Sequence, residues 1–435
     1  MKIAILGAGM AGFGAAHRCH AQRLRATVYE RRPYHGGHTA SHTSPEGFTF
    51  DEGPHISFSK QERIRTLFAE SVGGEYFESK AYVNNYWQGH WIRHPAQCNL
   101  YGLPEDLVVA VLQDFIQGQN APTPEIATYR DWLYASFGRS FAETFPLQYT
   151  RKFHTTEAAN MSVDWVAPRI YRPTLDEVLR GAVSALAPNV HYITEFRYPK
   201  RGGFVSFLDM FVKQADLRLG HAVVSVDTQR RTLTFANGSV AEYDGLVSSL
   251  PLPDLIPMIE GAPADVLAAV NQLACSEAVI VTVGVDRADL CRAHWTYFYD
   301  PEFCIVRLST PHMQSPNNAP PDHGSFQAEI YFSKKYKPLQ RAPAEYVDLV
   351  IEDLRRCGLM KESDKVVFRH ALHVPYANVI FDLERAAALK LVHAYLDELG
   401  IAYCGRYGEW AYIWTDESFV SGENAAQRIL DRGAL

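Results

Sequence analysis

The chain lacks the features that mark membrane-spanning, secreted or nucleic-acid-binding proteins. No apolar run approaches the ~20 residues that a membrane-spanning helix requires. The first residues also lack the charged segment and long apolar stretch of a secretory signal. The 49 acidic residues outnumber the 42 basic ones, the net charge is −7, and the basic residues are scattered. We therefore expect neither nucleic acid nor an anionic membrane as a partner, because both bind clustered basic side chains.

The sequence has no C-x-x-C pair either. Its seven cysteines are odd in number and are spread over 435 residues. This usage favours reduced thiols and predicts a cytoplasmic protein. The length allows two or three lobes, because domains commonly contain about 100 to 200 residues, and it is typical of an enzyme.

Metal ligands in a usable spacing are missing as well. His17 and His20 flank Cys19, and His90 and His94 lie four residues apart in HWIRH. No third ligand has a suitable spacing, and HWIRH is typical of a strand, which would place its two histidines on one face for packing. We therefore predict no metal site.

The first thirty residues do contain a dinucleotide-binding pattern. Residues 2–6 predict a buried strand, GAGMAGFGAAHRCHAQ a turn and helix, and RATVYE a second strand. Gly7, Gly9 and Gly12 form G-x-G-x-x-G, which allows a tight turn, a close approach of backbone to pyrophosphate, and close packing of helix and strand. Glu30 ends the second strand, where its carboxylate can accept from ribose hydroxyls. The pattern favours FAD or NAD over a glycine-rich turn without a ligand.

A second glycine pair, Gly36 and Gly37, follows in ERRPYHGGHTAS. It resembles the second glycine pair of the FAD-binding amine oxidase superfamily, which simple NAD dehydrogenases lack. The distant YCGRYGEWAYIWTDESFVSGENAAQRIL resembles that superfamily's C-terminal flavin segment, a strand and turn followed by a helix whose N-terminus faces the cofactor. Taken alone, that stretch could equally form a core strand followed by an ordinary capped helix that does not contact a flavin. The resemblance implies that both ends of the chain meet on FAD.

The pattern between these ends predicts two further lobes. Residues 60–190 are mostly helical by their apolar spacing, 221–250 contain short strands with a hairpin turn at ANG, and 275–335 are rich in β-branched and aromatic residues. AEYVDLVIEDLRRCG and GENAAQRILDR predict helices, the second with glycine and acid at its start. We predict an α/β fold: a Rossmann-type FAD-binding domain with an inserted helical lobe and a mixed β-sheet substrate lobe. The expected parts are an FAD-binding domain over 1–80, 196–260 and 386–435, a mainly helical insertion over 81–195, and a β-sheet substrate lobe with a helix over 261–385.

Four further segments carry a closer resemblance: TSPEGFTFDEGPHISFS, HWIRHPAQCNLYGLP, FRYPKRGG and HWTYFYDPEFCIVRLS. Within that superfamily, they make the chain similar to the UDP-galactopyranose mutase family almost from end to end, least in the helical lobe. This resemblance implies a FAD-dependent nucleotide-sugar pyranose/furanose mutase, in which N5 of the reduced flavin attacks the anomeric carbon with no net redox change. A nucleotide sugar is the expected substrate, reduced FAD the active cofactor, and NAD(P)H one candidate electron donor. The oligomeric state stays open.

The resemblance also implies an arginine pair, because a leaving diphosphate is held by guanidinium forks. Trp165 and Arg169 keep the four-residue spacing of the family, and Trp295, Tyr297 and Arg307 match its strand pair in order and spacing. A surface ion pair is the alternative for either arginine alone.

Other residues carry over by the same resemblance. His55 of FDEGPHISF is expected to position or polarise the flavin near N5, and Gln97 to lie near the nucleotide or flavin. Tyr376 and Tyr412 match family tyrosines that hydrogen-bond the diphosphate or line the pocket, and packing of their rings against a sheet is the alternative. The expected catalytic residues are His55, Arg169 and Arg307. The expected substrate-binding residues are Gln97, Trp165, Trp295, Tyr297, Tyr376 and Tyr412. The expected cofactor-binding residues are Gly7, Gly9, Gly12, Glu30, Arg31, Gly36, Gly37, His38, Thr39, Gly53, His55, Val223, Gly405, Arg406, Trp410 and Gly422.

The chain departs from the family pattern at three positions. Phe153 stands where the family usually has tryptophan, Gln314 where it has tyrosine, and LQYTRKF lacks an asparagine. The base or the sugar can therefore differ. One rival function is a FAD-dependent oxidoreductase of the amine oxidase or protoporphyrinogen oxidase type that acts on a small molecule. The other is a non-catalytic flavin-binding protein, which His55 and the arginines disfavour.

Overall fold

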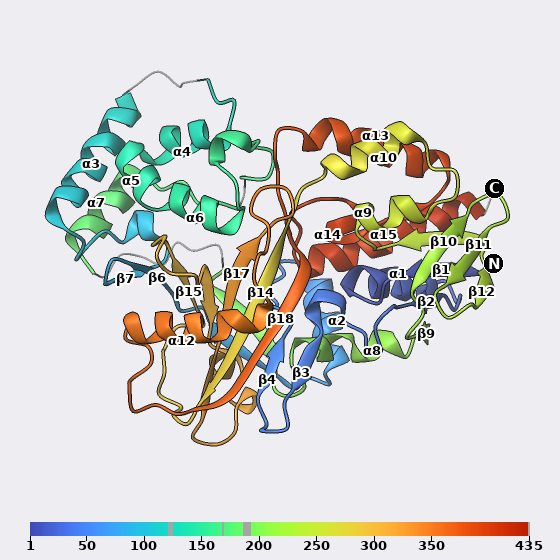
Figure 1. Ribbon diagram of the computed structural model, residues 1–435, viewed down its shortest axis with the longest axis horizontal. Coiled ribbons are helices and arrows are strands. Elements are labelled where there is room, and N and C mark those ends of the chain that lie inside the picture. The colour runs from blue at the N-terminus through green and yellow to red at the C-terminus, as the bar shows by residue number, and fades with distance from the viewer. Residues whose placement is uncertain (121–124, 168, 186–192, 434–435) are drawn as a thin grey trace.

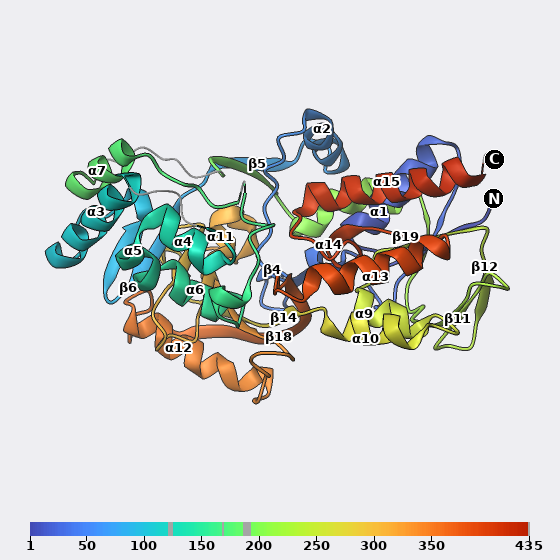
Figure 2. The same cartoon turned by 90° about the horizontal axis from the view of Figure 1, so that it is seen from above.

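A computed structural model describes residues 1–120, 125–167, 169–185 and 193–433. Figure 1 shows a helical lobe on the left, long strands of one sheet across the centre, and a second sheet with its helices on the right. The two termini lie side by side at the right in both views (Figure 1, Figure 2). Within the described ranges, no helix combines the length and the apolar character that crossing a membrane requires.

The dinucleotide-binding pattern forms a parallel sheet, in the order β19-β13-β1-β2-β9. Its strands are β1 Ile3–Leu6, β2 Thr27–Tyr29, β9 Asp216–Arg218, β13 Gly245–Ser248 and β19 Ala402–Tyr403. Helix α1 (Met10–Ala21) packs against α15 (Thr415–Gly433), and α10 (Ala264–Gln272) against α13 (Arg385–Glu398). The predicted fold class is therefore confirmed, and the C-terminal segment returns to the first helix.

A second sheet lies between this part and the helical lobe, in the order β18-β14-β17-β16-β15-β6-β7. Its strands are β6 Val83–Trp87, β7 His90–Arg93, β14 Cys275–Val285, β15 Trp295–Phe298, β16 Arg307–Ser309, β17 Gly324–Phe332 and β18 Val366–Val379. Neighbours are antiparallel except for β15 and β6, which are parallel. Buried side chains of α12 (Tyr346–Arg356) and of the central strands form one core, so α12 covers one face of this sheet.

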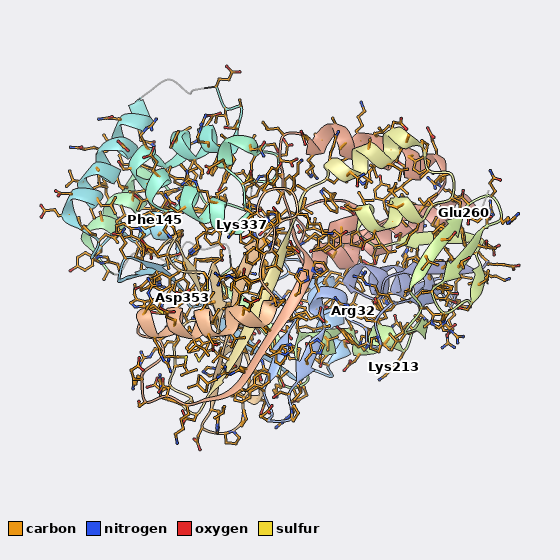
Figure 3. All side chains as sticks on the ribbon, in the orientation of Figure 1. Arg32, Phe145, Lys213, Glu260, Lys337 and Asp353 are labelled. Carbon is orange, nitrogen blue, oxygen red and sulfur yellow. The ribbon has the colours of Figure 1, made fainter. Side chains whose placement is uncertain are left out.

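The helical lobe contains α3 Glu105–Asn120, α4 Tyr129–Phe137, α5 Arg139–Thr144, α6 Pro146–Phe153 and α7 Leu175–Val183. Thr128 and Thr174 begin α4 and α7 with capping boxes, which satisfy backbone N–H groups at the helix starts. Phe145, labelled in Figure 3, is fully buried and packs against Phe141, Trp87 and Tyr299. Its ring therefore joins the lobe to the second sheet.

Residues 76–93 differ from the mostly helical stretch that we predict for 60–190. They form β5 (Tyr76–Lys80), β6 and β7. β5 pairs with β8 (Glu195–Pro199), and the aromatic residues of VNNYW and HWIR pair along the edge of the second sheet rather than facing a helix. HWIRH as a strand is confirmed over His90–Arg93. Residues 121–124, 168 and 186–190 of that stretch lie outside the described residues. The domain boundaries stay a prediction.

Smaller elements complete the fold. A three-stranded antiparallel sheet confirms the hairpin turn at ANG: β10 Val223–Asp227, β11 Thr232–Phe235 and β12 Val240–Glu242. The connecting elements are α2 Glu62–Ser71, β3 Ser41–Thr43, β4 Thr49–Asp51, β8 Glu195–Pro199, α8 Asp209–Val212, α9 Leu252–Leu255, α11 Pro311–Gln314 and α14 Gly405–Gly408.

The last helix begins earlier than its predicted glycine and acid. It starts at Thr415 because the Glu417 carboxylate accepts the backbone N–H of Trp414, at 2.7 Å, and so satisfies a donor at the helix start. Gly422 consequently lies inside α15, where a Cβ atom would overlap the carbonyl oxygen of Ala11 in α1. This glycine allows two helices to pack closely.

We expect Gly422→Ala to lower the free energy of unfolding by about 3 kcal/mol, because the methyl group meets backbone that cannot move aside. Chemical denaturation of the two proteins measures the change. Gly118→Ala is the matched control, since Gly118 lies in α3 with nothing near its Cβ position, and there alanine should raise stability by up to about 1 kcal/mol. Equal effects of the two substitutions would contradict the packing role.

Candidate functional site

A cavity of about 640 Å³ lies where the parallel sheet, the second sheet and the helical lobe meet. Its volume is within the range of small-molecule sites. The predicted residues that line it are Gly7, Gly9, Glu30, Arg31, Gly36, Gly37, His38, Thr39, Gly53, His55, Gln97, Trp165, Arg169, Val223, Trp295, Tyr297, Arg307, Tyr376, Gly405, Arg406 and Tyr412. The fold therefore gathers nearly all of the predicted site in one place.

Three predicted cofactor residues lie outside that lining. A Cβ atom on Gly12 would overlap the carbonyl oxygen of Gly7, so Gly12 allows α1 to pack against the end of β1. Trp410 is fully buried in the core, and its carbonyl accepts from Arg385 Nε at 2.9 Å. Gly422 faces α1, as described above. These residues shape the fold around the site and do not contact the cavity.

Two glycine loops form one side of the cavity. Gly7 and Gly36 have φ angles of +97° and +114°, a region that favours glycine, and the Gly36 N–H donates to the carbonyl of Ala8 at 2.8 Å. Glu30 accepts the backbone N–H of Ala8 at 3.0 Å and that of Arg32 at 2.9 Å, which fixes its carboxylate at the cavity wall. Side-chain-free backbone at the start of α1 fits the close approach of a dinucleotide phosphate.

His55 lies on the wall next to these loops. Its Nδ1 is 2.6 Å from the carbonyl oxygen of Gly53, which can only accept, so Nδ1 carries the proton. Burial lowers the pKa of His55 to about 4, the Gly53 carbonyl opposes this shift, and Arg406 and Arg307 lower the pKa further. The ring is therefore neutral near pH 7, with Nε2 unprotonated.

A buried carboxylate supports the same loop from behind. Glu52 accepts from Arg32 at 2.5 Å, from the Tyr34 hydroxyl at 2.7 Å, and lies 3.1 Å from His42 Nε2. Burial opposes its charge, but hydrogen bonds from His42 and Arg32 lower the pKa of Glu52 to about 2. Arg32, labelled in Figure 3, thus carries a paired charge at the cavity wall.

Strand register places two predicted side chains and one that was not predicted in a row. Tyr297 of β15 pairs with Arg307 of β16, which pairs in turn with Glu329 of β17. Arg307 donates to both carboxylate oxygens of Glu329, from Nη2 at 2.8 Å and also from Nε, and the Tyr331 hydroxyl donates to Glu329 at 2.8 Å. Burial opposes the charge of Arg307, but the Glu329 carboxylate raises the pKa of this guanidinium well above its usual value. The row therefore keeps the Arg307 guanidinium charged and fixed against the Glu329 side chain.

Arg169 approaches the cavity from the connection between α6 and α7 in the helical lobe. Its guanidinium carbon lies 3.6 Å from the centre of the Trp414 ring and 4.9 Å from that of Tyr412. Its Nη2 donates to Glu417 at 3.1 Å. Trp165, predicted four residues earlier, packs on Tyr412 at a ring-centre distance of 6.0 Å.

Tyr376 and Gln97 line the cavity, and their polar groups are bonded to other residues of the protein. The Tyr376 hydroxyl donates to Asp254 at 2.6 Å, and Asp254 also lies 3.7 Å from Arg31. Gln97 donates to the carbonyl of Tyr171 at 3.0 Å. Tyr376 therefore connects to the cofactor-binding side of the cavity through Asp254, rather than to the arginine pair.

Sequence reasoning missed several lining residues. Glu329 is the clearest, and its signal was a lone carboxylate in the otherwise apolar strand FQAEIYF. Tyr149 in α6 and His154 directly after it also line the cavity. So do Phe153 and Gln314, two positions at which the chain differs from the family pattern. No sequence signal distinguished Tyr149 and His154 from ordinary helix residues, because only the fold turns this end of α6 inward.

His154 is 4% exposed and packs between Phe153 and Trp165. Among the described residues, its Nδ1 has no hydrogen-bond partner. The next residue, Thr155, has a φ of +59°, and its hydroxyl donates to the His154 carbonyl at 2.6 Å and accepts from the Ser333 hydroxyl at 2.8 Å. The backbone after α6 is therefore strained and tied to the second sheet.

Possible metal ligands do not gather in the part of the chain that the structure describes. There, no group of three or more His, Cys, Asp or Glu side chains could hold a metal ion. His94 Nδ1 lies 3.0 Å from Asn85 Oδ1, which assigns it to packing and hydrogen bonding in the second sheet.

Comparison with known proteins places the chain among flavoproteins. The profile of the family described as flavin containing amine oxidoreductase matches residues 10–430. A structure of reduced UDP-galactopyranose mutase has 25% sequence identity and a TM-score of 0.93, over 99% of this chain and 96% of that chain. The predicted resemblance to that mutase is thus confirmed at the level of structure.

Oxidases share the fold at lower similarity. A putative protoporphyrinogen oxidase from Exiguobacterium sp. 255-15 has 16% identity and a TM-score of 0.74, over 99% of both chains. Cyclohexylamine oxidase from Brevibacterium oxydans IH-35A has 14% identity and a TM-score of 0.69, over 100% of this chain and 99% of that chain. These two similarities show a common fold only.

We expect His154 to make the protein sensitive to acid. Burial lowers the pKa of His154 from 6.5 to about 3, so below pH 6.5 protons bind the unfolded chain first and stability falls as the pH decreases. Between pH 7 and 5.5, wild type should lose about 1 kcal/mol more unfolding free energy than His154→Gln, since one pH unit corresponds to about 1.36 kcal/mol. Denaturation at both pH values measures this, and parallel pH profiles of the two proteins would refute it.

Proposed function

Because the chain belongs to the flavin containing amine oxidoreductase family, we propose that it is a FAD-dependent mutase that interconverts pyranose and furanose forms of a nucleotide sugar. One observation carries the proposal: Arg169 and Arg307 line the same cavity as the glycine loops and His55. A diphosphate leaving group requires such guanidinium groups, whereas oxidation of an amine does not.

We assign FAD to the glycine loops, with Glu30 at its ribose and with His38, His55 and Arg406 toward the ring. When bound and reduced, FAD would supply the nucleophile for the anomeric carbon, with no net redox change. NAD(P)H is one candidate for the electron donor. The neutral His55 offers Nε2 as a hydrogen-bond acceptor, so its proposed role is to position or polarise the ring rather than to transfer a proton.

The chain's own side chains would hold the sugar nucleotide. Arg307 is fixed by Glu329, so its charge faces the cavity without a change of position when the diphosphate departs. Arg169 supplies the second cation from the helical-lobe side. Tyr149, Phe153 and Trp165 line the part of the cavity near the lobe with aromatic rings, which suits the stacking of a planar base.

A FAD-dependent oxidoreductase acting on a small molecule is the second candidate. The observation that favours it is the bidentate pair of Arg307 with Glu329, because a paired cation attracts an anion less strongly than a free one. The two candidates differ in whether the substrate changes the oxidation state of the flavin: an oxidoreductase substrate would reduce it, whereas the mutase reaction would cause no net change.

Turnover with reduced flavin tests the choice. The protein is loaded with FAD, reduced chemically without oxygen, and incubated with UDP-galactose and with other nucleotide sugars, and the products are separated by chromatography. We expect a ring-contracted product only with the reduced enzyme, and no net oxidation of the flavin. Reduction of the oxidised flavin by an amine or a porphyrinogen, seen as loss of its absorbance, with no sugar product, would contradict the mutase proposal.

Arg307 and Glu329 can be separated by a double substitution. Arg307→Ala should lower the unfolding free energy by about 3–5 kcal/mol, because it leaves the buried Glu329 unpaired. Adding Glu329→Gln should recover most of this loss, while UDP binding stays weaker by a few kcal/mol in both variants, measured by calorimetry.

Arg287→Ala is the control for these two variants. Arg287 forms a similar pair with the buried Asp364, at 2.7 Å, away from the cavity lining. Its loss should reduce stability and leave UDP binding unchanged. Wild-type affinity for UDP in the double variant would remove Arg307 from the proposed site.

A further inference from the structure

Arg169 is held by two residues that the proposed function does not require. Trp414 and Glu417 belong to the C-terminal segment of the FAD-binding part, whereas Arg169 belongs to the helical lobe, between α6 and α7. The guanidinium carbon is 3.6 Å from the centre of the Trp414 ring, and Arg169 Nη2 is 3.1 Å from Glu417 Oε2. The contact therefore joins two distant parts of the chain at the cavity wall.

The Trp414 ring can fix the plane of the guanidinium. A cation over the face of tryptophan is attracted by the ring electrons, and the attraction is stronger where water is excluded. Arg169 is 12% exposed, and Tyr412 lies on it at 4.9 Å. Because the ring stacks on the face of the guanidinium, the N–H donors at its edge can still donate hydrogen bonds to other groups.

Glu417 uses only part of that edge. Its Oε2 accepts both Arg169 Nη2 and the backbone N–H of Trp414, the latter at 2.7 Å at the start of α15. The backbone hydrogen bond therefore holds the carboxylate in place if the guanidinium moves. Over the residues that the structure describes, Arg169 Nη1 is buried and has no hydrogen-bond partner. A buried donor without an acceptor is costly, and an anionic oxygen is its natural partner.

The two arginines differ in how their acids are held. Glu329, the partner of Arg307, is 5% exposed, whereas Glu417 is 37% exposed. Removal of the Glu417 charge should therefore disturb stability little, since partly exposed pairs contribute little.

We propose that Trp414 and Glu417 are positioning residues that set the affinity of Arg169 for an anionic ligand. Trp414 is the platform, and Glu417 is a fixed negative charge with which the ligand's phosphate competes. This inference rests on the proposed function only in taking Arg169 as a ligand for a diphosphate.

Calorimetric binding of UDP and of inorganic pyrophosphate to the FAD-loaded protein tests the roles. Glu417→Gln keeps an oxygen for the helix start and removes the charge, so UDP should bind about fivefold tighter. Trp414→Leu should weaken binding about tenfold, and Trp414→Phe should restore part of it. Glu423 lies on the same helix and pairs with Arg63, so Glu423→Gln is the control and should leave the affinity for UDP unchanged.

The outcomes separate this proposal from the mutase. Unchanged or weaker UDP binding by Glu417→Gln would overturn it, as would failure of wild type to bind either UDP or pyrophosphate. If Trp414→Leu unfolds, the Glu417→Gln result decides alone. The expected shifts without any ring-contracted product would overturn the mutase and leave the positioning roles standing.

Discussion

The close contact between the first and last helices is the constraint on which the rest of the structure depends. At Gly14 and Gly422 a Cβ atom would overlap backbone of α15 and α1, and at Gly12 it would overlap the backbone of Gly7 in the turn after β1. Because no side chain separates these segments, the turn after β1 and the loop before α15 open onto the same cavity. Glycine here acts through the space that it leaves, since a methyl group would push apart the two ends that form the site.

The second sheet supplies the other half of the site through its register. Tyr297, Arg307 and Glu329 are far apart in sequence, yet pairing across β15, β16 and β17 puts them side by side. A shift of one residue in any of these strands would turn its side chain to the α12 face. The packing of α12 on the opposite face is therefore part of what keeps Arg307 in the cavity.

Three ion pairs hold charged groups around the cavity. Glu52 is paired with Arg32, Arg307 with Glu329, and Arg169 with Glu417. His55 behaves differently, because burial lowers its pKa to about 4 and the ring is therefore neutral near pH 7. The cavity thus combines paired arginines with a neutral histidine.

Local patterns in the sequence determined the strand, turn and helix at the N-terminus and the strands of the second sheet within residues 275–335, because each depends on near neighbours or on a motif of fixed spacing. The family resemblance added part of the cavity lining, including Arg169 and Arg307. The start of α15, the strands at 76–93, and the positions of Trp410 and Gly422 were decided only by tertiary structure, since each depends on what packs against it. The same holds for Glu329, His154 and Trp414, whose partners lie in other strands and lobes. Sequence spacing identifies a residue that can bind an anion, but pairing between distant segments decides which acid or ring it meets, because those contacts exist only after the chain ends have come together.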